Sequence, residues 1–235
     1  MKESIKHRKF IFLCTEGLYY IGGLGVLCVA CTIVAAVRQS WSLMGMSLVM
    51  WLLFIEFCYF FRDPERDIPQ IPAEIVAPAD GRVISIKPMK EETFLRGEAL
   101  RVSIFMNIFS VHVNRSPIAG EITYFSYNPG KFISAFKEKA SLDNEQVSIG
   151  IEGGEGEKKD GRRVLVRLIA GLIARRIVLW KGKNDRIDKG ERMSIIKFGS
   201  RVDIYLPLDA DVLVSVGDHV TAGESVVALY GNSQQ

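Results

Sequence analysis

A glycine–serine step near the end of the chain carries residue types that can cut their own backbone. Gly199 and Ser200 lie in KFGSR (residues 197–201), where a serine hydroxyl follows a flexible glycine carbonyl. If the backbone is held distorted, that hydroxyl can attack the carbonyl, turn the amide into an ester and let β-elimination sever the chain. A pyruvoyl group then replaces Ser200, and its ketone can form a Schiff base with an amine and accept electrons from a departing carboxylate. Gly-Ser pairs are also ordinary turns, so the dipeptide alone decides nothing.

The proton shuttle for this chemistry has few candidates, because the chain contains only three histidines, His7, His112 and His219. His7 lies in a basic tail and His219 in a Gly-Asp turn, which are solvated settings. His112 is set among apolar residues in FMNIFSVHVNRSP (residues 105–117), and histidine has the neutral-pH proton affinity that a general base needs. A buried histidine satisfied by the backbone gives the same pattern. Asp80, in PADG, is a candidate carboxylate that could fix its tautomer, and equally a turn residue.

Two long apolar runs precede the part of the chain that holds these residues. Residues 18–37 are uncharged and long enough to cross a hydrocarbon core, and a second run, 41–61, follows after a short gap. The first run is too long for the core of a usual signal peptide, so we expect a membrane-anchoring helical hairpin over residues 1–61. Basic residues at its two ends outnumber Arg38 between the runs, which puts both ends in the cytoplasm. Glu56 leaves open whether the hairpin spans the bilayer or lies in one leaflet.

Beyond the hairpin the pattern changes to short alternating apolar stretches broken by glycines and prolines. This predicts a mainly β soluble domain over residues 62–235 with little helix, of which one short piece is expected over 133–140. The charged, glycine-rich tract 150–161 lacks the lysine of a phosphate-binding loop and is expected to be a solvated hairpin loop. The expected strands are 74–77, 81–87, 100–105, 120–127, 146–151, 163–169, 177–180, 194–196, 201–205, 211–214 and 225–230.

Two stretches of the soluble part resemble pieces of the small barrel-sandwich that biotinyl and lipoyl carriers build. They are APADGRVI (residues 77–84) and VGDHVTAGESV (residues 216–226). We therefore expect a lipoyl- or biotinyl-like barrel-sandwich. Carrier function would need a lysine between apolar residues at a hairpin tip, and the nearest candidate, Lys90, lacks that setting, so the likeness bears on the fold alone.

Taken in order, the motifs of the soluble part resemble the short bacterial form of the phosphatidylserine decarboxylase proenzyme family. No single motif is specific, but the ordered set covers nearly all of the soluble part. The motifs are FFRDPER (60–66), PADGRV (78–83), FMNIFSVHVNRSP (105–117), YNPGKF (127–132), DNE (143–145), IAG (169–171), ARRI (174–177), KG (189–190) and FGSR (198–201).

The resemblance implies a membrane-attached carboxy-lyase of phospholipid biosynthesis that converts phosphatidylserine to phosphatidylethanolamine and CO₂. It also implies a zymogen that cuts itself between Gly199 and Ser200 into a β chain, 1–199, and an α chain, 200–235, which stay together as a heterodimer. The cofactor would be a covalent pyruvoyl group made from Ser200, with neither pyridoxal phosphate nor a metal. The location would be the inner membrane of the cell, with the catalytic domain on the cytoplasmic side.

The resemblance further implies roles for two side chains. His112 and Asp80 match family positions tied to maturation and proton transfer. Arg115 stands where longer members of the family carry a second histidine, and Arg201 stands where they carry threonine. A scheme that needs two imidazoles therefore does not fit this chain.

Composition limits the other classes of function. With 48% hydrophobic residues and a net charge of +3, the chain is globular, and it has no basic run interleaved with aromatic residues that would indicate nucleic-acid binding. Cys28 and Cys31 lie in an apolar run typical of packing, so no disulfide framework is expected. A membrane-anchored carrier and a lipid-binding pseudoenzyme stay open as alternatives, whereas a zinc peptidase would need an HxH or HExxH motif that is not present. Oligomers larger than the heterodimer are left open.

Overall fold

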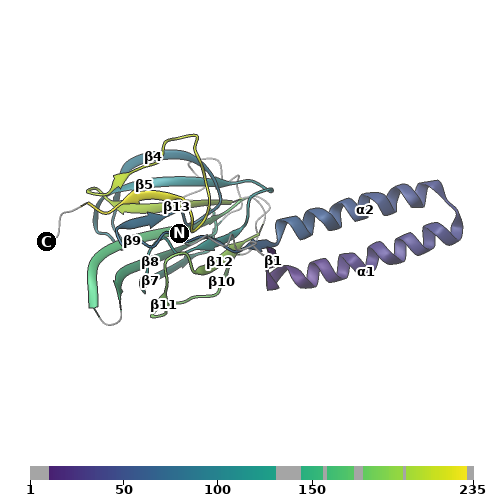
Figure 1. Ribbon diagram of the computed structural model, residues 1–235, viewed down its shortest axis with the longest axis horizontal. Helices are drawn as coiled ribbons and strands as arrows, with labels where there is room; N and C mark the ends of the chain where they lie inside the picture. Colours follow the sequence, from purple (N-terminus) through teal and green to yellow (C-terminus); the bar gives the residue numbers. More distant parts are fainter. Residues whose placement is uncertain (1–10, 131–143, 156–157, 172–176, 198–199, 232–235) are drawn as a thin grey trace, which may run out of the picture. The chain divides into compact units, whose positions relative to one another are not determined.

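The protein is described by a computed structural model, which divides into two compact units, Met1–Glu65 and Arg66–Gln235 (Figure 1). Strands hold 45% of its residues and helices 23%, and the two long helices precede the sheets. This confirms a mainly β domain after an N-terminal helical hairpin, whereas the assignment of a catalytic domain to residues 62–235 stays a prediction. The structure describes residues 11–130, 144–155, 158–171, 177–197 and 200–231.

The first unit is a helical hairpin whose base is closed by a pair of short strands. Helices α1 (Thr15–Arg38) and α2 (Trp41–Phe60) are flanked by β1 (Ile11–Leu13) and β2 (Arg62–Pro64), which pair antiparallel. Helix α1 stops because Gln39 takes the left-handed conformation, with φ 46°, and its N–H returns to carbonyls of the last turn. Both helices are long and apolar enough to cross a bilayer.

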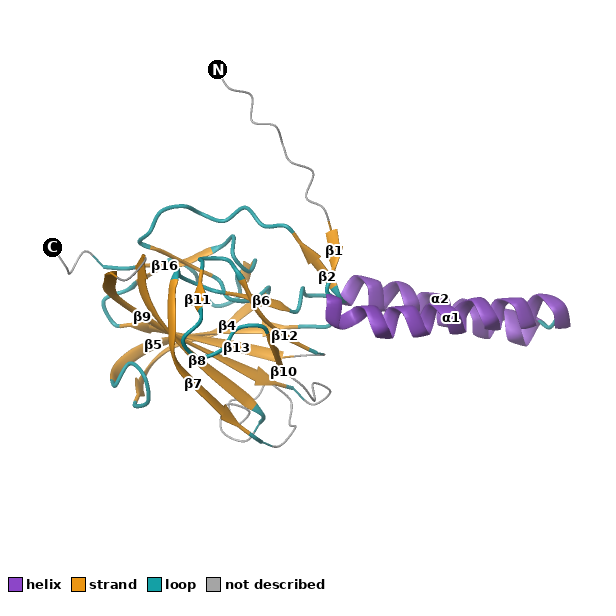
Figure 2. Ribbon diagram, turned by 90° about the horizontal axis from the view of Figure 1, so that it is seen from below, coloured by secondary structure: helices purple, strands orange, loops and turns teal. Residues whose placement is uncertain are grey.

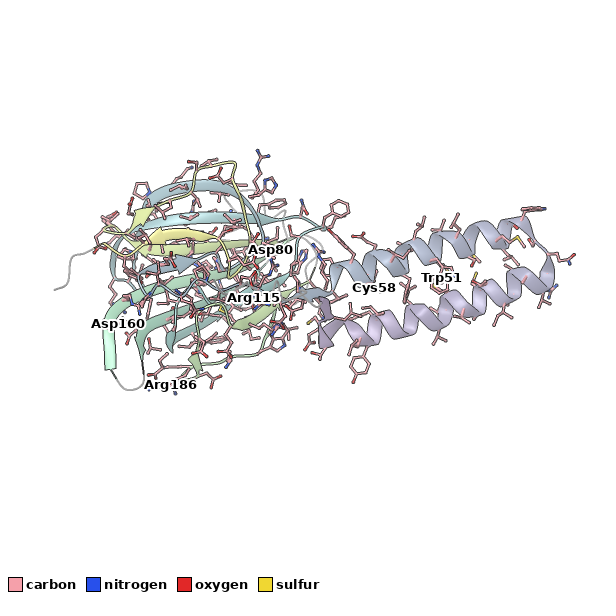
Figure 3. All side chains as sticks on the ribbon, viewed as in Figure 1. Trp51, Cys58, Asp80, Arg115, Asp160 and Arg186 are labelled. Carbon is pink, nitrogen blue, oxygen red and sulfur yellow. The ribbon has the colours of Figure 1, made fainter. Side chains whose placement is uncertain are left out.

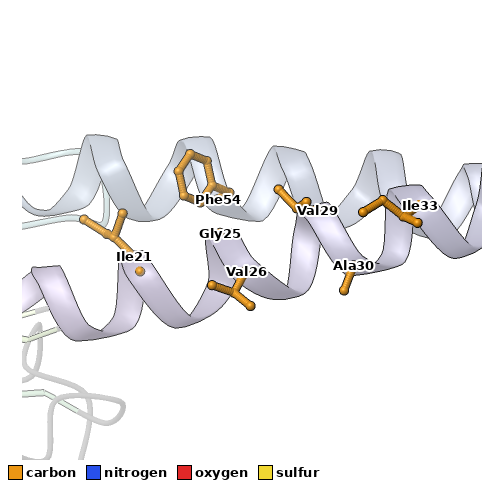
Figure 4. A pocket seen from close by; sticks show the side chains of 8 residues that line it. Ile21, Gly25, Val26, Val29, Ala30, Ile33 and Phe54 are labelled. Carbon is orange, nitrogen blue, oxygen red and sulfur yellow. The ribbon is translucent and has the colours of Figure 1, made fainter.

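Hydrogen bonds between polar side chains join the two helices of this apolar hairpin. Thr32 Oγ1 donates to the Cys28 carbonyl at 2.7 Å, lies 2.7 Å from Ser47 Oγ, and accepts a hydrogen bond from Trp51 Nε1 at 3.1 Å. Hydrogen bonds between membrane helices contribute about 1 kcal/mol each and favour one register of the pair. Midway along α1, a Cβ at Gly25 would lie only 3.1 Å from the Phe54 ring, beside an open apolar groove of about 550 Å³ (Figure 4).

The second unit is organised around a large antiparallel sheet of eight strands, which curls on itself (Figure 2). Its order is β11-β7-β8-β9-β13-β5-β4-β15, so the strand that begins at Ser200 lies in its interior. The strands are β4 (Gly81–Glu91), β5 (Gly97–Met106), β7 (Gly120–Asn128), β8 (Gln146–Glu155), β9 (Lys158–Ala170), β11 (Arg186–Ile187), β13 (Ser200–Pro207) and β15 (His219–Val220).

Two small antiparallel sheets complete this unit, with the orders β10-β12-β6 and β14-β16-β3. The first places β6 beside β12, and the second pairs β16, near the end of the chain, with β3, near the start of the unit. The last part of the chain is therefore interleaved with strands that come much earlier. The strands are β3 (Glu74–Val76), β6 (Val113–Arg115), β10 (Ile177–Leu179), β12 (Arg192–Ile196), β14 (Asp211–Val212) and β16 (Val226–Leu229).

Both faces of the large sheet are covered around β13. On one face Val202 and Ile204 alternate into the main core together with Met106 of β5, because successive side chains of a strand point to opposite faces. On the other face Phe94, from the turn between β4 and β5, packs against Tyr205. A polar side chain on either face of β13 is therefore buried and has to find a partner.

The prediction of a hairpin loop over residues 150–161 is wrong. Strand β8 continues to Glu155 and β9 begins at Lys158, with Gly154 paired to Lys159, so most of the tract is ladder. Backbone hydrogen bonds can extend a hairpin beyond the core whatever its side chains, and a charged, glycine-rich composition does not reveal this. Of the strands of two or three residues, β3, β10 and β14 were predicted, whereas others, such as β6 and β15, were missed. The helix predicted over 133–140 lies outside the described residues.

Candidate active site

Three interior strands of the large sheet begin or end at the same end of the sheet. Strand β5 ends at Met106 and β9 ends at Ala170, and β13 begins between them at Ser200, which pairs with both residues. We call this the Ser200 end of the sheet. Ser200 is fully buried, and the alternation along β13 turns its side chain toward the same face as Val202.

The Ser200 hydroxyl is held in a weakly polar setting. Its Oγ donates to Met106 Sδ at 3.2 Å, directly across the β5–β13 ladder. A thioether sulfur is a weak acceptor, so this hydrogen bond is easily exchanged for a better one. The serine is therefore shielded from solvent without being locked to a strong acceptor.

Two pairs of strands that are consecutive in the chain also pair with each other near Ser200. Residues 107–112 lead from β5 to β6 and residues 197–199 lead from β12 to β13, while β5 pairs with β13 and β6 pairs with β12. The Ile196 N–H donates to the His112 carbonyl at 3.3 Å, at the point where the shorter connection starts. The fold thus brings the main chain of His112 to the end of β12, four residues before Ser200. Phe198 and Gly199 lie outside the described residues, so the structure describes only the Ser200 side of the predicted cut.

The tautomer of His112 is set by the backbone. His112 is fully buried, and its Nδ1 lies 2.9 Å from the Ser110 carbonyl oxygen. A carbonyl oxygen only accepts hydrogen bonds, so in the neutral ring Nδ1 carries the hydrogen and Nε2 keeps the lone pair that can take a proton. The sequence suggested that a carboxylate could fix this tautomer; in the structure a main-chain carbonyl is in that position.

Asp80 lies in the loop that leads from β3 into β4, close to the strand that follows His112. The Arg115 N–H of β6 donates to the Pro78 carbonyl at 2.9 Å, and Figure 3 marks Asp80 and Arg115 on these neighbouring segments. The Asp80 carboxylate accepts from Arg66 Nη2 at 3.0 and 2.9 Å and from the Ala222 N–H at 2.8 Å. Because β5 separates β4 from β13, the start of β4 lies about 10 Å from Ser200.

The arginine at the position of the second family histidine has a local structural role. Arg115 is buried, and its Nη1 donates to the Gly190 carbonyl at 3.0 Å. A Cβ at Gly223 would lie 3.1 Å from Arg115 Cδ and 3.0 Å from Ile68 Cδ1, so a larger residue would push against both side chains. Gly190 and Gly223 both have φ of +77°, which glycine adopts without strain.

Sequence reasoning missed four residues of this site. Arg66, Met106 and Ala222 contact Asp80 or Ser200, as described above. The fourth, Asn144, is fully buried and its Nδ2 donates to the carbonyl of Ala170, the residue paired with Ser200. All four lie in stretches that the sequence analysis singled out: FFRDPER, FMNIFSVHVNRSP, DNE and VGDHVTAGESV. Those stretches marked the positions without giving a role, and residue type gives no signal for a contact made through a thioether or a main-chain amide.

Behind Ser200, the opposite face of β13 carries a buried ion pair. Arg201 lies 2.9 Å from each oxygen of Asp203, through Nε and Nη2, and both side chains are almost fully buried. Further along, burial raises the pKa of Tyr205, against the opposing charge of Arg167. Among the described residues no three His, Cys, Asp or Glu side chains gather as a metal site would need, and the expectation that no metal is used stays a prediction.

Comparison with known proteins points in one direction. The family described as phosphatidylserine decarboxylase matches residues 53–228. A protein of Symbiobacterium thermophilum is 44% identical over 215 residues, which cover 92% of this chain and 94% of the relative. Relatives from Desulfotalea psychrophila and Amoebophilus asiaticus are 45% and 39% identical, covering 90% and 100% of this chain and 94% and 96% of their own lengths. All three carry the name phosphatidylserine decarboxylase proenzyme.

Proposed function

The chain belongs to the phosphatidylserine decarboxylase family, and on that premise we propose that it matures by cutting itself between Gly199 and Ser200. The mature protein then removes the carboxylate of phosphatidylserine as CO₂ and leaves phosphatidylethanolamine. The observation that supports this most directly is the position of Ser200, which is buried at the start of an interior strand, together with the hydrogen bond between the Ile196 N–H and the His112 carbonyl four residues earlier.

Maturation needs a nucleophile, a base and one water molecule. Ser200 Oγ attacks the carbonyl carbon of Gly199 while its proton passes to His112 Nε2, and the peptide C–N bond breaks to leave an ester. Loss of the Cα proton of residue 200 then expels the carboxylate of Gly199. The dehydroalanine that remains reacts with water, releases ammonia and becomes the pyruvoyl group.

The geometry at residue 200 fits such a group. A pyruvoyl ketone supplies a Schiff base with the substrate amine and an electron sink for the departing CO₂. Strands β5 and β9 fix its position from both sides. His112 Nε2 is the group that we place to return a proton to the substrate α-carbon.

The two products of the cut would remain one molecule. The α chain, residues 200–235, would hold β13, β14, β15 and β16, and each of β13, β15 and β16 pairs with a strand of the β chain. Strand β13 lies between two strands of the β chain, whereas β16 lies between β3 of the β chain and β14 of the α chain. We therefore propose a heterodimer of the two chains that needs no covalent link.

Membrane attachment by the hairpin suits a diacyl substrate that stays in the bilayer. We propose that the hairpin anchors the enzyme in the cell membrane with the catalytic domain on the cytoplasmic side, as the excess of basic residues at the ends of the hairpin predicts. A single cysteine placed at exposed Lys183, in a background without the native cysteines, tests this. It should resist an impermeant maleimide in intact cells and react after lysis, and efficient labelling in intact cells would refute this topology.

The mass of the purified protein tests the proposed maturation. The α chain should be about 4 kDa, at the average residue mass of this chain (26.3 kDa over 235 residues), with an N-terminus that resists Edman degradation. Decarboxylase activity is measured in the same preparation as CO₂ release from phosphatidylserine in mixed micelles. An active protein of unbroken length would refute self-cleavage at Ser200.

A further inference from the structure

The segment that leaves the membrane hairpin reaches directly into the site. Arg66 is the first residue of the second unit, and its side chain is 8% exposed. One nitrogen, Nη2, contacts both carboxylate oxygens of Asp80 at 3.0 and 2.9 Å. Its Nη1 lies 4.0 Å from Glu224 Oε2, and Glu224 also accepts the Asp67 N–H at 3.0 Å.

Asp80 is thus held by groups from two distant parts of the chain. Besides Arg66, the Ala222 N–H donates to Asp80 Oδ1 at 2.8 Å. Two donors on one carboxylate fix both its position and its rotation, which a single hydrogen bond does not. Under the proposed maturation Arg66 and Asp80 belong to the β chain and Ala222 to the α chain.

Further contacts hold the exit segment, residues 66–72, in place. Ile68 packs against Gly190 and Gly223, where any Cβ would meet its side chain. Lys189 Nζ donates to the Ile71 carbonyl at 2.6 Å, and Arg162 donates to the Pro72 carbonyl. Arg66 is the member of this set that contacts Asp80, so its effect on the site can be separated from anchoring of the segment.

We propose that Arg66 is a positioning residue for Asp80, so that the segment leaving the membrane hairpin completes the site for maturation. Arg66 acts through the orientation of the carboxylate and touches neither Ser200 nor the substrate. The inference rests on the proposed function, because it requires Asp80 to act in maturation. A misplacement of about 1 Å in a reacting constellation can slow a step by about 10²-fold, which sets the scale of the expected effect.

The test is a double-mutant cycle in the full chain. Wild type, Arg66→Met, Asp80→Asn and the double variant are made by cell-free synthesis into lipid nanodiscs, and cleavage is followed by gel during a chase. Arg66→Met should slow cleavage about 10²-fold relative to wild type. In the Asp80→Asn background the same change should add less than about twofold, because the group it positions is already gone.

Two further variants separate positioning from folding. Arg66→Lys keeps the charge and one donor, so it should recover part of the cleavage rate. Arg162→Met removes another anchor of the exit segment without touching Asp80, and it should be cut at the wild-type rate. The thermal midpoint of every variant is measured in parallel. Arg66→Met should be slow in cleavage at temperatures where it is fully folded.

The outcomes distinguish the inference from the function on which it rests. If wild type is not cut, the proposed maturation fails. If Asp80→Asn is cut and active like wild type, the role of Asp80 fails and the inference fails with it. If Asp80→Asn is slow but Arg66→Met is cut normally, or if the two effects multiply in the double variant, the proposed function stands and the role of Arg66 is refuted.

Discussion

The two ends of the large sheet hold buried polar groups through different partners. At the Ser200 end, Ser200 donates to the Met106 thioether and His112 contacts the Ser110 carbonyl. At the opposite end, the hairpin turn after β4 is closed by Glu91, which is also buried and accepts hydrogen bonds from several main-chain N–H groups. Burial is common to both ends, so the partners of these groups, rather than burial, distinguish the residues that we propose to react from the one that closes a turn.

The largest effect should follow from removing the proposed nucleophile at the Ser200 end of the sheet. Ser200→Ala should abolish cleavage and activity, because no hydroxyl remains to attack the Gly199 carbonyl, while the strand keeps its ladder. Intact mass measures the result. Ser103→Ala, which removes a buried hydroxyl from the opposite face of β5, is the matched control and should be cut normally. Cleavage of Ser200→Ala would place the nucleophile elsewhere.

The next effect concerns the base. His112→Ala should slow cleavage by about 10² to 10⁴, the usual range for general-base help, and should lower CO₂ release per cut chain. Arg115 does not replace it, because a guanidinium does not exchange protons near neutrality. His112→Asn separates chemistry from packing, since its amide can still donate to the Ser110 carbonyl. If this variant is cut and active like wild type, His112 is a packing residue.

A third change tests the face of β13 behind the nucleophile. Asp203→Ala leaves Arg201 buried without its carboxylate, which should destabilise the fold by about 3–5 kcal/mol. The double change Arg201→Met with Asp203→Ala removes both charges and should recover much of that loss. Denaturant unfolding in detergent measures both, in a Ser200→Ala background that keeps the chain whole. Equal stability of the single variant and its parent would show that this pair contributes nothing.

The smallest effect on cleavage should come from a change at the opposite end of the sheet, at Glu91. Burial raises the pKa of Glu91, but hydrogen bonds from Thr93, Phe94 and Leu95 outweigh it and hold that pKa below its usual value. The contribution of Glu91 to the free energy of unfolding is therefore complete above its unfolded pKa, about 4.3, and is lost as the pH falls through its lower folded pKa. Glu91→Gln should lower the thermal midpoint at pH 7, flatten its fall in acid, and leave cleavage unchanged. Slowed cleavage would show that the two ends of the sheet are not separate in function.

The sequence was informative where a pattern repeats or a motif is long. The apolar runs predicted both helices to within a few residues, and alternation predicted most of the long strands, including β13 from Arg201 onward. It failed where structure depends on partners distant in sequence. Most of the tract 150–161 is strand because β8 and β9 pair with each other, and nothing in its composition shows that pairing.

The same limit applies to the candidate site. Ser200, His112 and Asp80 were singled out by residue type and motif, but their surroundings were not. That Arg66 reaches Asp80, or that Met106 faces Ser200, depends on register between segments far apart in the chain. The motif that contains Arg66 marked this residue, but only the folded structure shows that it contacts Asp80.

The interior position of β13 also has a consequence for refolding. In the uncut chain β13 reaches its place between β5 and β9 by an intramolecular search, so the folding rate is independent of concentration. After the proposed cut, denaturation frees a short peptide from a larger one, and recovery requires a collision between two molecules. Refolding of the mature protein should then slow on dilution, while that of the Ser200→Ala proenzyme should not. The cut would thus make folding an event that the chain completes efficiently only once, before it becomes an enzyme.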